Sequence, residues 1–317
     1  MGRNSFFVFI PSISLSIFWA SCGPLDITNK NSNSIPNPAG THSFLRQFGD
    51  CVAGGPCLMN PSYLALDGKG NLYITAQQND CIEVWTTSGT YEYYLGGSSQ
   101  FTSGPGGVAL DGLGDTYASD FSGNRIVALT GSAAPVIGSY GSGNGQLSEP
   151  LALAADSGGN VYVADVGNNR IEVFSPAGAY VTQWGSWGTG NGQFRGLGGI
   201  VLDGNGHLYV ADAGNSRIQE FTTSGSPVTQ WGGQGTGNGQ FSTNSPAGLA
   251  FGANGFLYAV DSGNNRIEEF NSSGTFQTAW GSAGSGQGQF ENPSGIAVDA
   301  SLNVYVSNMA YIEVFGP

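Results

Sequence analysis

The feature that most constrains this chain is a segment that recurs six times. Residues 160–185, NVYVADVGNNRIEVFSPAGAYVTQWG, contain three short stretches of strand-forming residues separated by turn residues. An Arg-Ile pair marks the same point in four copies, with spacings of 45, 47 and 49 residues between Arg125, Arg170, Arg217 and Arg266. Cys81 and Tyr311 occupy this arginine position in the copies at either end. A repeat of this length is typical of a β-propeller or another repeat array.

Within one copy, the hydrophobic pattern predicts four strands. Residues 200–203 form a nearly all-apolar run, which is typical of a strand buried on both faces. Residues 207–212 and 217–221 alternate apolar and polar side chains, and residues 227–231 carry the last strand. Gly- and Asn-rich turns separate these stretches, and no helical period is present. Four antiparallel strands per repeat predict an all-β fold, a six-bladed β-propeller of four-stranded blades.

The two ends of the repeat region predict how the ring closes. Each copy ends on a large side chain followed by glycine, but the last copy stops after its third strand, at Phe315. The missing pair is found near the N-terminus, as Phe48 followed by Gly49. We therefore expect residues 43–49 to supply the outer strand of the C-terminal blade. Such closure removes strand edges that would otherwise pair with other chains.

The first 41 residues differ from the repeats in composition. Residues 1–22 contain one arginine and an apolar run, and end in Ala-Ser-Cys, which resembles a bacterial lipoprotein signal with Cys22 as the lipidated residue. An ordinary secretory peptide, cut near Ala20 or Ser21, is the alternative. Residues 23–41 are rich in Asn, Ser and Pro and predict a flexible tether. The chain is thus expected to be exported to the bacterial cell envelope, lipid-anchored or secreted, with the propeller in residues 42–317.

Charge and cysteine content limit the partners of the chain. Nine basic residues against 22 acidic ones give a formal net charge of −13, so the basic surface that nucleic acid requires is lacking. Membrane contact is expected only through a lipid anchor, and we expect a monomer. Cys51 and Cys57 flank a turn-rich segment and could form a disulfide across it in an exported protein. Reduced cysteines are the alternative.

Three of the copies resemble NHL repeats. They are NVYVADVGNNRIEVF at 160–174, HLYVADAGNSRIQEF at 207–221 and FLYAVDSGNNRIEEF at 256–270. PSGIAVD at 293–299 is similar to the first strand of that family. The resemblance extends over nearly all of 43–317 and is weakest in the first and last copies, where Ala76 and Asn308 replace the repeated aspartate. It implies a six-bladed propeller, in agreement with the strand pattern.

Repetition also separates structural residues from candidates for function. The repeated Asp and Arg are expected to support turns through ion pairs, because both are present in most blades. Loops between second and third strands share a face with the connections between blades, and recognition usually lies on such loops. The non-repeated residues expected on that face are Gln77, Gln78, Asp80, Phe121, Trp187, Arg195, Met309 and Tyr311. Trp187 and Arg195 are the strongest candidates, since Trp and Arg are frequent at binding hot spots. Packing within the loops is the alternative.

Catalytic signals are weak. The two histidines, His42 and His207, cannot form a three-histidine zinc centre within one chain. The Asp-Gly-x-Gly-Asn segments lack the alternating ligands of an EF-type calcium loop and predict hairpin turns. The predicted function is therefore non-enzymatic recognition of a protein or glycan, without a cofactor. The alternative is a lactonase- or lyase-like enzyme, with scattered ligands for a divalent cation such as Ca²⁺ in the central channel.

Overall fold

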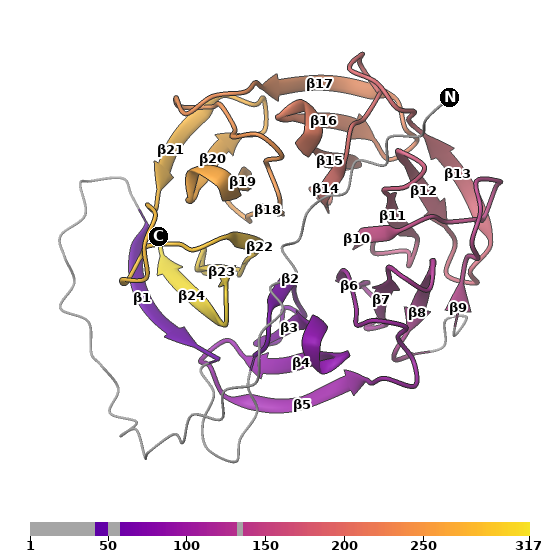
Figure 1. The fold of residues 1–317 in the computed structure, drawn as a ribbon, viewed down its shortest axis with the longest axis horizontal. Coiled ribbons are helices and arrows are strands. Elements are labelled where there is room, and N and C mark those ends of the chain that lie inside the picture. Colours follow the sequence, from indigo (N-terminus) through magenta and orange to yellow (C-terminus); the bar gives the residue numbers. More distant parts are fainter. Residues whose placement is uncertain (1–41, 50–57, 132–135) are drawn as a thin grey trace, which may run out of the picture.

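The computed structural model describes residues 42–49, 58–131 and 136–317, which form a ring of six four-stranded antiparallel sheets (Figure 1). The predicted all-β, six-bladed propeller is confirmed. The expected signal and tether at 1–22 and 23–41, together with Cys51 and Cys57, lie outside the described residues and stay predictions. No helix within the described ranges is long and apolar enough to cross a membrane.

Five blades are each made of four consecutive strands, with the first strand nearest the centre of the ring (Figure 1). In chain order these strands are β2 (Pro61–Leu66), β3 (Asn71–Ala76), β4 (Cys81–Thr86) and β5 (Tyr91–Gly96); β6 (Val108–Leu110), β7 (Thr116–Asp120), β8 (Arg125–Ala128) and β9 (Val136–Ile137); β10 (Pro150–Ala155), β11 (Val161–Asp165), β12 (Arg170–Phe174) and β13 (Tyr180–Trp184); β14 (Leu197–Leu202), β15 (His207–Asp212), β16 (Arg217–Thr222) and β17 (Pro227–Gly232); β18 (Leu249–Phe251), β19 (Phe256–Asp261), β20 (Arg266–Asn271) and β21 (Phe276–Trp280).

Three single turns of 3₁₀-helix stand between the second and third strands of blades one, four and five, where only turns were predicted. They are η1 (Gln77–Asn79), η2 (Ala213–Asn215) and η3 (Ser262–Asn264). These turns and the connections between blades lie on one side of the ring, which we call the loop face. The hairpins that join the first strand to the second and the third to the fourth lie on the other side, the hairpin face.

The sixth blade joins both ends of the chain. It contains β22 (Pro293–Val298), β23 (Val304–Asn308) and β24 (Tyr311–Gly316), and β1 (Ser43–Phe48) is its outer strand (Figure 1). β1 runs antiparallel to β24, with Phe44 opposite Phe315. Just before β1, His42 is buried, with Nε2 at 3.1 Å from Glu269 Oε2 of the fifth blade. The predicted closure of the ring by residues 43–49 is therefore confirmed.

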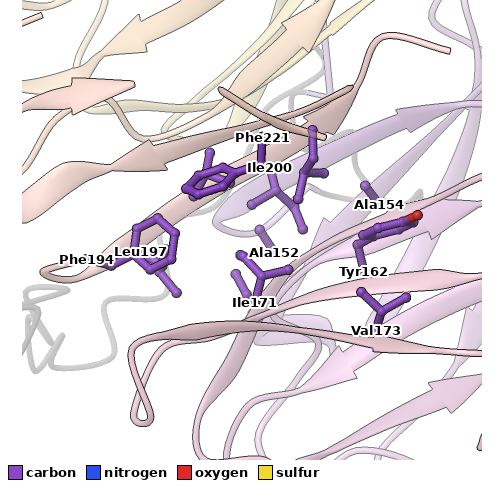
Figure 2. Close-up of a cluster of buried hydrophobic side chains, with 12 residues drawn as sticks. Ala152, Ala154, Tyr162, Ile171, Val173, Phe194, Leu197, Ile200 and Phe221 are labelled. Atoms are coloured by element: carbon purple, nitrogen blue, oxygen red, sulfur yellow. The ribbon is translucent and has the colours of Figure 1, made fainter. Parts of the chain in front are cut away.

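The hydrophobic core lies between blades, because each sheet presents apolar side chains on both of its faces. Figure 2 shows the cluster between the third and fourth blades, in which Ala152 and Ile171 of one blade share a core with Phe194, Ile200 and Phe221 of the next. Comparable clusters join the other neighbouring blades. The stability of each blade therefore depends on its neighbours.

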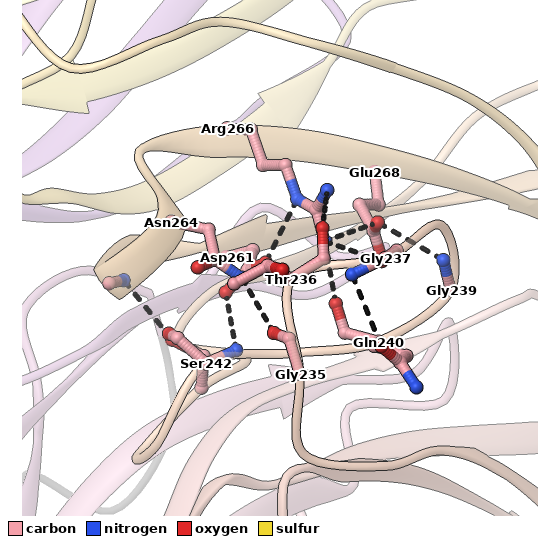
Figure 3. Close-up of polar contacts among 12 residues, drawn as sticks. Gly235, Thr236, Gly237, Gly239, Gln240, Ser242, Asp261, Asn264, Arg266 and Glu268 are labelled. Carbon is pink, nitrogen blue, oxygen red and sulfur yellow. Dashed lines mark hydrogen bonds and ion pairs between the residues drawn. The ribbon is translucent and has the colours of Figure 1, made fainter.

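The repeated Asp and Arg hold the connections between blades in place. In the fifth blade, Asp261 accepts hydrogen bonds from the Ser242 amide at 2.9 Å, from Asn264 Nδ2 at 2.7 Å and from Arg266 Nε at 3.0 Å (Figure 3). The guanidinium of Arg266 also donates to the carbonyl oxygens of the preceding connection, at Thr236, Gly237 and Gln240. These repeated residues thus form the rigid support of the loop face.

Glu313 is a buried carboxylate in the blade that has Tyr311 where most blades have arginine. It accepts hydrogen bonds from the Gly288 amide at 3.0 Å and from Asn308 Nδ2 at 2.9 Å. Burial outweighs these bonds and raises the pKa of Glu313 from 4.5 to about 7. Because the folded protein holds this proton more tightly than the unfolded chain, the contribution of Glu313 to stability is largest below pH 4.5 and falls as the pH rises towards 7.

We therefore expect Glu313→Gln to be more stable than the parent at pH 8, by up to roughly 3 kcal/mol, and about equally stable at pH 4.5. The fourth blade already has Gln219 at this position, where it accepts a hydrogen bond from the Gly192 amide. Urea unfolding at both pH values measures the difference. The exposed Glu92→Gln is the control, and a Glu313→Gln protein less stable than the parent at pH 8 would contradict the prediction.

Candidate functional site

One position on the loop face carries a different side chain in each of four equivalent connections. In each connection this residue forms a parallel bridge with the buried residue that precedes the next blade; the four pairs are Tyr140 with Leu147, Trp187 with Phe194, Gln234 with Phe241, and Ala283 with Phe290. A glutamine closes each loop in the same way, as when Gln193 Oε1 accepts the Gly190 amide hydrogen at 3.0 Å. The backbone is thus shared, while the exposed side chain varies.

Trp187 and Arg195 are brought together on this backbone. The guanidinium carbon of Arg195 lies 4.5 Å from the centre of the Trp187 ring, and Trp187 is 64% exposed. The Arg195 amide donates to Asp212 Oδ1 at 2.8 Å, and its carbonyl oxygen accepts from the Gly214 amide at 2.7 Å. Both side chains therefore project from a fixed backbone and form a cation–π pair.

Tyr140 was missed by the sequence analysis. It occupies the position of Trp187 in the connection one blade earlier and is 73% exposed. Alignment of the repeats could have identified Tyr140, because the segments that contain Tyr140 and Trp187 align without gaps from Gly138 and Gly185 onward. Two successive connections therefore expose a large aromatic side chain on the loop face.

The other predicted candidates belong to other blades. Gln77 and Gln78 lie in η1, where Gln77 Oε1 accepts a hydrogen bond from Asn60 Nδ2 at 3.0 Å. Phe121 follows β7 and is half-buried, and Met309 follows β23 and is 51% exposed.

Tyr311 begins β24, and its hydroxyl accepts a hydrogen bond from Asn308 Nδ2 at 3.2 Å. Asp80 ends η1 with a left-handed backbone. These residues are distributed around the loop face. Gln77 contacts Asn60, 17 residues earlier in the chain, and Tyr311 contacts Asn308, three residues earlier.

Tyr63 is the second residue that the sequence analysis missed. It stands near the start of the innermost strand, at a position that holds glycine or alanine in the other five blades: Gly107, Ala152, Gly199, Gly248 and Gly295. The Tyr63 side chain packs against the cluster between the first and second blades and also against the cluster of the third and fourth blades. Burial raises the pKa of its phenol well above the usual range. A large side chain therefore occupies the inner ring of the propeller.

The side chains that commonly bind metal ions are dispersed in the described part of the chain. Among residues 42–49, 58–131 and 136–317, no group of three or more His, Cys, Asp or Glu side chains is arranged to hold a metal ion. The free thiol of Cys81 is buried, and burial raises its pKa to about 12.

Comparison with known proteins agrees with this architecture. The NHL repeat family matches residues 147–174 and 194–221, and no curated protein matches the chain. Similar solved structures include a catalytically inactive histidine-to-alanine variant of virginiamycin B lyase from Staphylococcus aureus with quinupristin, at 19% identity over 81% of this chain and 80% of that chain, with a TM-score of 0.56. A streptogramin B lyase structure is 15% identical over 87% of this chain and 98% of that one, with a TM-score of 0.59.

A gluconolactonase from Xanthomonas campestris is 14% identical over 88% of this chain and 91% of that one, with a TM-score of 0.62. At such identities, similarity between structures establishes the fold alone. The chain is therefore a six-bladed β-propeller that carries NHL repeats in its third and fourth blades.

Proposed function

We propose that this protein is a non-enzymatic binding module whose loop face recognises a protein or glycan at the bacterial cell envelope. The observation that carries the proposal is the exposed Trp187–Arg195 pair on a backbone shared with neighbouring blades. In this proposal the chain is exported, and either lipid-anchored through Cys22 or secreted.

The physical basis is preorganisation. The hydrogen bonds of the Arg195 backbone to Asp212 and Gly214 hold the pair in position before a partner arrives. Binding then loses little conformational entropy in this loop, so more of the contact energy remains as affinity. The Trp187 ring offers a broad apolar face to a sugar ring or an apolar side chain, and the Arg195 guanidinium offers hydrogen-bond donors.

The alternative function is that of an enzyme, because lyase and lactonase structures share the fold. Loss of one histidine inactivates the virginiamycin B lyase variant. Here His42 is buried against Glu269 and stacks on Trp280, and His207 lies on the hairpin face. Tyr63 also occupies the inner ring, where a channel substrate would have to bind. These observations favour a binding module over a channel enzyme.

The proposal is tested by binding of the full chain to a glycan array and to a panel of envelope proteins. We expect Trp187→Ala and Arg195→Ala each to weaken capture of the partner about thirtyfold, as for hot-spot residues, with unchanged melting temperatures. Gln234→Ala is the matched control, because Gln234 occupies the position of Trp187 in the next connection. If both variants still captured the partner, the assignment of this site would be overturned.

A further inference from the structure

A cavity lies on the hairpin face, between the fourth and fifth blades. Its volume is about 330 Å³, within the range of small-molecule sites. Asp203, His207, Tyr209 and Glu220 of the fourth blade line it together with Phe251 of the fifth. It lies on the opposite face of the ring from Trp187 and Arg195, so it is separate from the site proposed above.

Three ionisable groups meet in this cavity. His207 Nδ1 is 3.1 Å from Asp203 Oδ2 and 3.7 Å from Glu220 Oε1. The two carboxylate side chains are only 4% and 6% exposed, whereas His207 is 38% exposed. The imidazole is thus the most exposed of the three groups, and the two almost buried carboxylates line the cavity beside it.

His207 and Glu220 differ from the residues at the same positions in most other blades. In three other blades an asparagine stands in the place of His207 and donates Nδ2 to the aspartate that begins the hairpin; these residues are Asn71, Asn160 and Asn303. At the position of Glu220, three other blades have valine (Val84, Val173 and Val314) and the second has Ala128. The fifth blade has Glu269 there, which is paired with His42. The other hairpins close without an imidazole, and three blades have an apolar valine in place of Glu220, so the fold does not require the pairing of His207 with Glu220.

The charge in this cavity is not balanced by arginine or lysine. No such residue lines it in the described part of the chain, whereas the cavity of about 240 Å³ between the first and second blades has Lys69 beside Asp67 and Asp111. Burial raises the pKa of Glu220, and the nearby His207 acts in the opposite direction. A buried carboxylate without a permanent cation is costly and attracts a positively charged ligand.

The wall of the cavity suits a cation as well. The rings of Tyr209 and Phe251 are stacked, with centroids 5.3 Å apart and an interplanar angle of 26°. Tyr209 is only 1% exposed, so the half-buried Phe251 presents the aromatic surface of the cavity. An aromatic face beside carboxylates attracts organic cations through the ring quadrupole. We propose that this cavity binds a small organic cation with a primary ammonium group, held between Glu220, Asp203 and the aromatic wall.

The two histidines provide a direct test by NMR, because the chain has only two imidazoles and His42 is buried elsewhere. Titration of the full chain with n-butylammonium chloride is expected to shift the His207 resonances with saturation and to leave those of His42 in place. Sodium chloride at equal concentration and the neutral analogue n-butanol are expected to produce no such shift.

The variant Glu220→Val introduces the residue that three other blades have at this position, so the fold is expected to be retained while affinity for n-butylammonium falls at least tenfold. Glu92→Gln, which removes an exposed carboxylate from another blade, is expected to bind like the parent. Nα-acetyl-lysine methylamide distinguishes the source of the amine: tighter binding than n-butylammonium indicates a protein lysine, and weaker binding a free amine. An unchanged His207 signal, or equal responses of parent and Glu220→Val, would overturn the proposal.

Discussion

Deletion of residues 1–49 should leave a protein that aggregates or melts far below the full chain. This deletion removes β1 and exposes the backbone edge of β24, which would then be free to pair with other chains. It also removes Phe48, which is buried against Trp85, and the contact between His42 and Glu269. Each buried aromatic contributes about 1.5–3 kcal/mol, whereas a whole domain is stable by only about 5–15 kcal/mol.

The matched control for this experiment is deletion of residues 1–41, which keeps His42 and β1. Thermal melting and light scattering of the two truncated proteins and the full chain measure the effect. We expect the 42–317 protein to melt like the full chain. If the 50–317 protein did so too, closure by β1 would contribute nothing to stability.

Gly295→Ala should cause the second large loss, of about 3 kcal/mol or more. Gly295 lies on the innermost strand β22, where a Cβ atom would overlap the carbonyl oxygen of Ser62 and come within 3.0 Å of the Tyr63 Cα atom. Both of these are backbone atoms of β2, the innermost strand of the next blade, and cannot rotate away. The added methyl group would therefore push two blades apart where the ring is narrowest.

Gly158→Ala is the control for this substitution. Gly158 lies in the hairpin between β10 and β11, and its nearest neighbour would be the side chain of Asp156, at 3.3 Å from the new Cβ. We expect this variant to stay within about 1 kcal/mol of the parent in urea unfolding. Equal stabilities of the two glycine variants would show that the inner strands are not in close contact at Gly295.

The ring could be predicted because its signals are local and repeated. Short strand periods, turn residues and the shared pair of Phe48 and Gly49 determine the blade count and the closing strand without knowledge of any distant contact. Tyr63 could also have been found by alignment of the six innermost strands, since five of them have a small residue at its position.

The contacts between side chains could not be predicted in the same way. The approach of Arg195 to Trp187 depends on how a glycine-rich connection folds back on itself, and strand periodicity carries no information about that path. Prediction of the cavity at His207 would require two pieces of information. One is the register that places Tyr209 opposite Glu220, and the other is the packing of Phe251 from the next blade. The first follows from a hairpin, but the second requires the assembled ring.

The closing strand also has a consequence for the order of events during synthesis. His42 and its partner Gly316 are 274 residues apart, so β1 is made long before its neighbour β24. At a usual translation rate of about 5–20 residues per second, β1 waits roughly 14 to 55 seconds for the strand that completes it. The ring therefore closes only after β24 has been made, and until then β1 lacks the neighbour with which it pairs.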